Sequence, residues 1–495
     1  MKNKIISIST ALVIGCSTSV MAQDDVAGFL EGIQGMATQS GGTVSFSDRY
    51  VGTDNSVEYT DLTISAPDGE VVITADWFKA VPSASVLGQV TFTLSPMTTV
   101  TINNSDFPAP LVLNISNDTL VITVDGLTSG QDAPTLNYSV SANNLSISAE
   151  TGGNPFLRAL DLSFDDLAEN FSITMATMLI ENSGSISNAT YTYDFTSPED
   201  DVMSGSGDFA DFEYAMSFFA VDKRRMPEYM SGALSAFLNM SIGESTGSAV
   251  ISNRDMDMAY TGTSEGGTAA IAIQDGRFTL TEIGGAANYS FTKLNIDGMP
   301  IPPFDFSAGG VELDIAVPFN TDGDFEEAKV LFALHDLQVS ESLLAMVDPG
   351  QVISRDPINF VIDVTANVKS NVDWNDPEAS FESGNPADIG EIRDVSINQI
   401  LIGAGGATIT ATGSADIDNS MGFPFPTGSI TVVANGVQAL VNGIVELGYL
   451  PQAEAGMAMG MMMAFARAGD NADEFISDIE FSPQGVTANG VPLPF

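Results

Sequence analysis

The alternation of apolar and polar side chains is the feature that most limits what this chain can fold into. From Val57 onward, apolar residues recur at every second position in short runs, separated by Asp-Gly, Asn-Asp, Pro and Ser clusters. This period of two is typical of strands, because successive side chains of a strand point to opposite faces of its sheet. The runs are Val57–Ile64, Val71–Ile73, Val90–Leu94, Leu111–Ile115, Leu120–Val124, Leu145–Ile147, Ser248–Ser252, Thr268–Gln274, Ala287–Ile296, Val311–Val317 and Ser429–Val433. Since helical crossovers do not separate them, they predict antiparallel pairing rather than an α/β fold.

Five stretches carry helical patterns instead. Residues 23–42 begin with acidic N-cap candidates and place their apolar side chains on one helical face. Phe164–Phe171 and Pro227–Met240 are predicted as short helices in the middle of the chain. Gly436–Gly448 and Pro451–Arg467 predict two consecutive helices near the C-terminus.

Together these patterns predict a mainly β protein with a few α-helices (α+β). Its architecture is an extended, curved antiparallel sheet with a helical hairpin at 436–467, followed by a strand hairpin over Phe475–Phe481 and Val486–Asn489. Pro300-Ile301-Pro302-Pro303 is a stiff turn or linker. The predicted divisions are a signal peptide at 1–22, an N-terminal helix at 23–42, a β-rich region with short helices at 43–300 and a β-rich C-terminal region at 301–495.

The first residues predict export. Lys2 and Lys4 precede a short apolar run, and Val20-Met21-Ala22 offers small or apolar residues before a cleavage point. A basic start, an apolar run too short to span a bilayer and such an exit are typical of a secretory signal peptide. We therefore expect a periplasmic protein.

A lipoprotein signal overlaps the same segment. Val13-Ile14-Gly15-Cys16 fits the pattern in which the cysteine is acylated and becomes the mature N-terminus. Lipidation at Cys16 would tether the protein to a membrane, whereas cleavage after Ala22 would remove the only cysteine.

Charge and composition exclude several classes of function. The formal net charge is −48, from 64 acidic and 16 basic residues. Nucleic-acid binding requires several cationic contacts to phosphates, so we exclude it as a main role. No stretch after the signal peptide approaches the roughly 20 apolar residues of a membrane-spanning helix, and none is predicted.

Residues suited to catalysis are scattered. His335 is the only histidine, and Asp336 follows it at the end of an apolar strand-like run. A Ser-His-Asp site would have to use His335. Paired carboxylates of a glycosidase are available by number, but only Trp77 and Trp374 could supply indole rings for a sugar. We predict no catalytic residue.

Two kinds of metal site are conceivable from local composition. Asn320–Asp324 and Asp416–Asn419 collect oxygen ligands suited to Ca²⁺, but neither follows the twelve-residue calcium loop. Met457, Met459 and Met461–Met463 carry thioethers, which Cu(I) favours, although methionine on a helix is commonly adaptable packing. We predict no metal site and no cofactor.

The last residues of the chain carry one feature typical of outer-membrane β proteins. Val491, Leu493 and Phe495 alternate at the C-terminus. Pro492 and Pro494 interrupt them, and proline breaks the hydrogen-bond ladder of a strand.

The order of short motifs resembles a known family. Its parts are Asp348-Pro349-Gly350, Arg355-Asp356-Pro357, Trp374, Asp376-Pro377-Glu378, Pro426-Thr427-Gly428, Leu447-Gly448, the methionine-rich helix and Ala488–Leu493. This order is similar to the exported bacterial family called domain of unknown function 2125. The resemblance implies an envelope location and carries no established activity or site residue. The closing pattern also has a weak similarity to envelope proteins of the AsmA type.

These observations predict an exported, non-catalytic envelope protein that binds or guides lipid or serves as a scaffold in envelope assembly. A lipid or an envelope protein would be its partner. The alternatives are a hydrolase that acts on an envelope polymer and an outer-membrane-associated β protein.

Overall fold

The computed structural model describes residues 34–35, 38, 41–67, 69–103, 109–126, 135–149, 156–197, 201–219, 226–319, 323–374, 382, 389–419 and 425–493. The chain divides into two compact units. Unit 1 comprises 1–220, 242–259 and 295–298, and unit 2 comprises 221–241, 260–294 and 299–495. The predicted signal peptide, Cys16 and most of the helix predicted at 23–42 lie outside the described residues.

Strands account for 66% of the structure and helices for 10%, which confirms the predicted mainly β fold with few helices. Among the described residues, no helix combines the length and the apolar character needed to cross a membrane.

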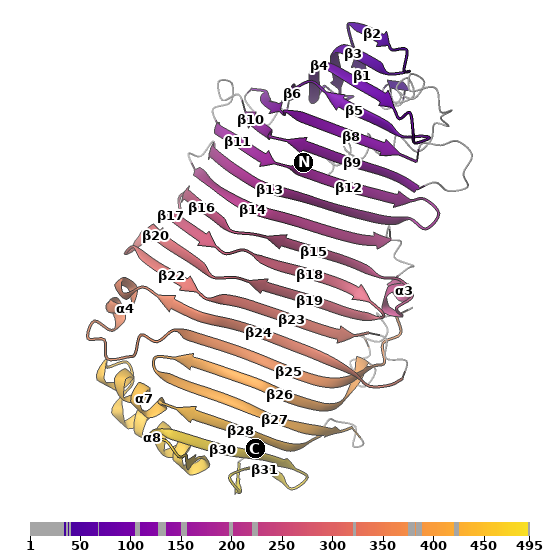
Figure 1. Ribbon diagram of the computed structural model, residues 1–495. Coiled ribbons are helices and arrows are strands. Elements are labelled where there is room, and N and C mark those ends of the chain that lie inside the picture. Colours follow the sequence, from indigo (N-terminus) through magenta and orange to yellow (C-terminus); the bar gives the residue numbers. More distant parts are fainter. Residues whose placement is uncertain are drawn as a thin grey trace. The chain divides into compact units, whose positions relative to one another are not determined.

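Unit 1 is an antiparallel sheet (Figure 1). Its strands are β1 (Thr43–Ser45), β2 (Asp48–Val51), β3 (Val57–Ser65), β4 (Val71–Pro82), β5 (Val90–Leu94), β6 (Met97–Ile102), β7 (Leu111–Ser116), β8 (Thr119–Asp125), β9 (Thr135–Asn143), β10 (Leu145–Ala149), β11 (Leu157–Asp165), β12 (Leu167–Thr174), β13 (Leu179–Thr196), β14 (Val202–Phe219) and β16 (Ser245–Ser252). Short strands lie end to end in pairs, so that β11 and β12 together match the length of β13. Two more strands, β17 (Met256–Ser264) and β20 (Ala287–Ile296), are divided between the units.

An irregularity recurs near the middle of the unit 1 strands. In β14, Asp211 takes a left-handed conformation with φ of 48° and is left out of the register with β13. Apolar residues occupy odd positions before it and even positions after it, yet the rings of Phe209 and Phe212 lie 6.2 Å apart. One extra residue therefore keeps both halves of the apolar pattern on one face.

Other strands of unit 1 carry similar left-handed residues at breaks in the alternation. Asp166, between β11 and β12, has φ of 48°, and the hydroxyl of Ser187 donates to its carboxylate at 3.0 Å. Asp61 in β3 and Asn144 between β9 and β10 are also left-handed. Asp and Asn tolerate this conformation better than other residues with a Cβ, which explains their place at the breaks.

A buried cluster occupies one half of the apolar face of unit 1. It consists of Val57, Tyr59, Ala80, Val90, Phe92, Val124 and Leu136. Aromatic rings extend it, with Phe78 stacked on Phe92 at 5.7 Å and Tyr138 on Phe171 at 4.8 Å. Burial raises the pKa of Tyr138 to about 12.

Unit 2 is an antiparallel sheet with short helices. Its elements are α3 (Met226–Met230), β15 (Ala236–Ile242), β18 (Gly267–Gln274), β19 (Arg277–Gly284), β21 (Met299–Ile301), β22 (Phe304–Ala308), β23 (Gly310–Pro318), β24 (Glu326–Val339), α4 (Glu341–Val347), β25 (Ile358–Ser370), β26 (Gly390–Ala404), β27 (Ala407–Asp418), β28 (Phe425–Asn435), α7 (Val437–Glu446), α8 (Gln452–Phe465), β29 (Arg467–Ala468), β30 (Glu474–Ser482), β31 (Gly485–Ala488) and β32 (Val491–Pro492). The strands β18, β19, β23, β24, β25, β26, β27, β28 and β30 pair in that order. Figure 1 shows α4, α7 and α8 beside the same ends of these strands.

Two predicted helices are wrong. Phe164–Phe171 forms the end of β11 and most of β12. The extra residue Asp166 puts Phe164 and Leu167 three positions apart, a spacing that imitates one face of a helix. In Pro227–Met240, only the first turn is helical, because Gly232 ends α3 in the left-handed conformation and β15 follows.

The C-terminal predictions are confirmed. The helices α7 and α8 form the helical hairpin predicted at 436–467, and β30 pairs with β31 as the strand hairpin that follows.

We predict that Asp211→Val lowers the stability of unit 1 by about 1–2 kcal/mol, because a β-branched residue is strained at positive φ. Asp211→Gly should change it little. In a Trp374→Phe background, the remaining tryptophan, Trp77 on β4, reports urea unfolding of unit 1. The control is Glu213→Val, which places valine at an exposed position of the same strand with ordinary strand geometry. Equal unfolding midpoints for the two valine variants would contradict the assigned role of Asp211.

Candidate ligand-binding surface

One face of the unit 2 sheet is built from rows of apolar side chains. Residues that are paired across neighbouring antiparallel strands point to the same face. One such row runs from Ile271 through Leu280, Ile315 and Val330 to Val364, over β18, β19, β23, β24 and β25. Each position is aliphatic, so the row forms a continuous apolar strip across the strands.

Two parallel rows widen the strip. We use the name apolar face for the three rows together, which consist of Ile271, Leu280, Ile315, Val330, Val364 and Ile397, then Leu313, Phe332, Ile362 and Ile400, then Val311, Leu334, Phe360, Ile402 and Ile409. On each strand, neighbouring rows are generally two positions apart. The residue between them points to the opposite face.

The apolar face is open to solvent. Ile271 is 42%, Val330 45% and Ile402 44% exposed. Phe332 and Ile409 are also exposed. The described hydrophobic residues that unit 2 buries fully are mostly alanines, so a second layer of its own side chains does not cover the strip.

Aromatic rings continue the apolar surface toward β17, β20 and β22. Phe291 stacks on Phe304 at 4.8 Å and lies 6.0 Å from Phe306. Tyr260 stacks on Phe291 at 5.7 Å. Tyr289 lies 5.0 Å from Phe306 and occupies the space that a side chain at Gly262 would need.

The opposite face of the sheet carries fixed polar pairs. Lys329 Nζ lies 2.8 Å from Asp314 Oδ2, and hydrogen bonding to this carboxylate raises the pKa of Lys329. Asn367 donates to Asp394 at 2.8 Å, which lowers the pKa of the Asp394 carboxyl group. The opposite face therefore carries charged and amide side chains in fixed pairs, whereas the three rows of the apolar face consist of aliphatic and aromatic residues.

A depression of about 410 Å³ lies over β17, β20, β22 and β24. Most of its lining residues carry a hydroxyl, amide or carboxyl group, although apolar atoms form the larger part of the lining surface; the lining consists of Thr261, Gly262, Thr263, Asn288, Tyr289, Ser290, Asp305, Phe306, Ser307, Gln338, Val339 and Ser340. This lining lacks a cationic side chain, so it suits a neutral polar group better than a phosphate.

The candidate residues from the sequence do not converge. His335 and Asp336 are exposed within β24 rather than at its end, and Asp336 is one of the left-handed breaks. Asp416 pairs with Asp394 and Thr427 in the ladder, and Asn419 donates to the carbonyl of Ile392 at 2.8 Å. Of the Asn320–Asp324 stretch, the first three residues lie outside the described part. No group of three or more potential metal ligands forms among the described residues.

The two tryptophans lie in different units. Trp77 lies on β4 of unit 1. In unit 2, Trp374 packs edge-on against Phe319 at 5.1 Å and donates to its carbonyl at 3.3 Å.

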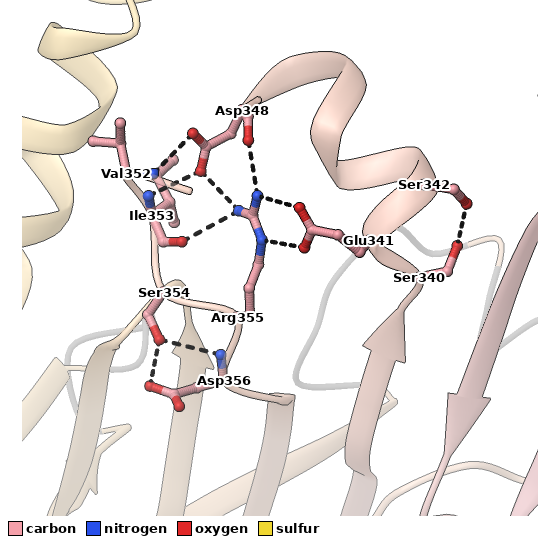
Figure 2. A network of polar contacts seen from close by, with 9 residues as sticks. All are labelled: Ser340, Glu341, Ser342, Asp348, Val352, Ile353, Ser354, Arg355 and Asp356. Carbon is pink, nitrogen blue, oxygen red and sulfur yellow. Dashed lines mark hydrogen bonds and ion pairs between the residues drawn. The ribbon is translucent and has the colours of Figure 1, made fainter. Parts of the chain in front are cut away.

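Arg355 organises the loop between α4 and β25, as Figure 2 shows. Its guanidinium contacts Asp348 Oδ2 at 2.7 Å and Glu341 Oε2 at 2.9 Å, and donates to the carbonyl of Asp348 at 2.8 Å. Asp348 is 2% exposed and also accepts the backbone N–H groups of Val352 and Ile353, both at 2.9 Å. We call Glu341, Asp348 and Arg355 the arginine clamp.

Charge and hydrogen bonding set the ionisation of the clamp. Burial acts to raise the pKa of Asp348, but the two backbone donors and Arg355 outweigh it and hold the pKa below its ordinary value. Hydrogen bonds from Arg355 likewise lower the pKa of Glu341. The clamp fixes Val352 and Ile353, which pack against Gly443 of α7.

The sequence pattern contains the clamp without revealing it. Asp348-Pro349-Gly350 and Arg355-Asp356-Pro357 are two of the motifs that carry the family resemblance. In the structure, Asp348 of the first forms an ion pair with Arg355 of the second. Opposite charges seven residues apart are the only signal in the sequence. The openness of the apolar face has no sequence signal at all, because an apolar strand position reads the same whether it is covered or not.

A comparison with family models matches residues 233–493 to a family described as "Uncharacterized protein conserved in bacteria (DUF2125)". The chain belongs to this family. The matched stretch starts just before β15 and contains the apolar face, the arginine clamp and both C-terminal helices. No curated protein and no solved structure matches the chain.

We predict that Arg355→Ala destabilises unit 2, because it leaves the buried carboxylate of Asp348 without its cation. In a Trp77→Phe background, Trp374 reports the thermal unfolding of unit 2. The midpoint should fall by several degrees in Arg355→Ala. The pair of the exposed Arg393 with Asp394 provides the control, and Arg393→Ala should have little effect.

The clamp also predicts a pH dependence. Since folding lowers the pKa of Asp348, its stabilisation is present above the ordinary carboxyl pKa of about 4 and is lost as the pH falls through the folded value. The difference in the thermal unfolding midpoint of unit 2 between wild type and Arg355→Ala should be constant from pH 8 to 5. It should shrink below about pH 4, and a gap that widens there would be inconsistent with the clamp.

Proposed function

We propose that this protein is an exported, non-catalytic envelope protein that binds the acyl chains of a lipid along the apolar face of unit 2. The observation that carries the proposal is the exposure of Ile271, Val330 and Ile402 in rows that cross the sheet. Contiguous exposed apolar surface is uncommon on soluble proteins and marks binding surfaces. Periplasmic location belongs to the proposal and rests on the signal peptide pattern.

The dimensions of the strip suit an acyl chain. From β18 to β27 the sheet takes six steps between neighbouring strands, which amount to about 29 Å at roughly 4.8 Å per step. One bilayer leaflet is about 15 Å of hydrocarbon, so the strip is long enough for an extended chain. Rows of aliphatic side chains that run across the strands fit a linear apolar molecule better than a globular one.

Burial supplies the driving force. Covering apolar surface contributes about 25 cal/mol per Å², and the three rows offer their branched side chains and rings for it. The aromatic rings around Phe291 and Phe306 extend the same contact. The similarity of the C-terminal pattern to AsmA-type envelope proteins belongs to this proposal as well.

The test is lipid co-purification. We expect native mass spectrometry and organic extraction of the protein purified from the periplasm to find bound lipid. The double variant Ile271→Asn/Ile402→Asn should reduce the lipid by at least about fivefold, because both changes put amides into the open strip.

Ile283→Asn is the matched control. Ile283 is exposed like the other two, lies on β19 of the same unit and pairs with Thr268 and Glu312 on the opposite face. The control variant should keep its lipid. Wild-type protein without lipid, or equal lipid in the double variant, would leave scaffolding as the role of the protein.

A further inference from the structure

The helix α8 presents an apolar surface that the sheet does not use. From Ala455 to Phe465 it contains only Ala, Gly, Met and Phe. Ala455 is buried, and the carbonyl of Phe465 accepts hydrogen bonds from Ser477 at 2.9 Å and Asn489 at 2.8 Å. The helix is thus held at both ends while its middle is open.

The exposed part of α8 is broad. Met457 is 65%, Met461 62% and Met463 54% exposed, and nothing approaches the open positions of Gly456 and Gly460. At about 100° per residue, the exposed positions cover an arc of roughly 200°. A globular helix is expected to show solvent a polar face, and α8 shows it an apolar one.

Neighbouring residues enlarge this surface. Tyr449, in the turn before α8, is exposed, and its hydroxyl donates to the carbonyl of Val347 at 2.9 Å. Met346 and Val347 of α4 are exposed beside that contact. We call Met346, Val347, Tyr449, Met457, Met461 and Met463 the methionine patch.

The charge pattern indicates what covers the patch. Glu454 is the only charged side chain between Glu446 and Arg467, in a chain of 64 acidic and 16 basic residues. The acidic remainder is repelled by anionic lipid, and the patch offers no cation to attract it. A flat or grooved protein surface covers one side of a helix, whereas a lipid matrix surrounds an arc as wide as this one.

We propose that the methionine patch docks unit 2 on a zwitterionic phospholipid surface, with α8 lying in the interface and its methionines among the upper acyl chains. Tyr449 stands at the border, where an amphipathic ring suits the headgroup level. The helix, about 21 Å long, lies in this interface rather than across the bilayer. This docking is separate from lipid binding on the apolar face and stands without it.

Vesicle flotation of the mature chain, residues 23–495, tests the proposal. The protein should float with phosphatidylethanolamine–phosphatidylcholine vesicles, and less with vesicles that contain phosphatidylglycerol. The triple variant Met457→Gln/Met461→Gln/Met463→Gln should bind at least about tenfold more weakly, since it removes most of the exposed apolar side chains of α8 while keeping good helix formers.

Met178→Gln/Met203→Gln/Met299→Gln is the control, because these methionines are exposed elsewhere. It should float like the wild type. Wild-type protein that stays with the unbound fraction, or a triple variant that floats normally, would overturn the docking. A dimer that dissociates in the triple variant, without flotation, would assign the patch to a second copy. Lipid co-purification measured on the same samples separates this outcome from the fate of the proposed function.

Discussion

The apolar face of the unit 1 sheet depends on extra residues at breaks in its strands. Side chains alternate with a period of two, so a strand that simply continued past Asp211 would turn its second apolar half to the opposite face. The inserted residue restores the alignment, as the contact between Phe209 and Phe212 shows. In unit 2, Gly309 and Asp336 stand at corresponding breaks, where the N–H of Gly309 donates to the carbonyl of His335 at 2.8 Å. Without Asp211, the apolar residues of β14 would divide between the two faces of the unit 1 sheet.

The two units are stabilised by different interactions, because unit 1 buries a cluster of large apolar side chains and unit 2 leaves many of its own exposed. In unit 1 the cluster around Tyr59 and Phe92 buries large side chains, and the ladder and core support each other. In unit 2 the ladder, the arginine clamp and the packing of Gly443 against Val352 and Ile353 hold the structure. Several of its large apolar side chains are exposed.

Much of the fold was predictable because the strand signal is local. Ala287–Ile296 matches β20 at both ends, and α7 and α8 lie where their patterns place them. The false helix at Phe164–Phe171 arose from the same insertion that shapes the sheet, because Asp166 turns a period of two into a spacing of three. A parity change at an Asp or Asn between two alternating runs is a usable signal for such breaks. The pairing of Arg355 with Asp348 depends on a loop conformation, and the exposure of Val330 depends on the absence of a layer, so neither could be derived from local pattern.

The acidity of the chain acquires a physical role in this arrangement. Two copies with open apolar strips would bury them against each other unless another force opposed the contact. A net charge of −48 supplies that force at long range, since like-charged surfaces repel before apolar faces meet. A small, neutral or weakly charged amphiphile is repelled far less than a second polyanion. Self-repulsion therefore discriminates against association with another copy while leaving the apolar face accessible to a lipid.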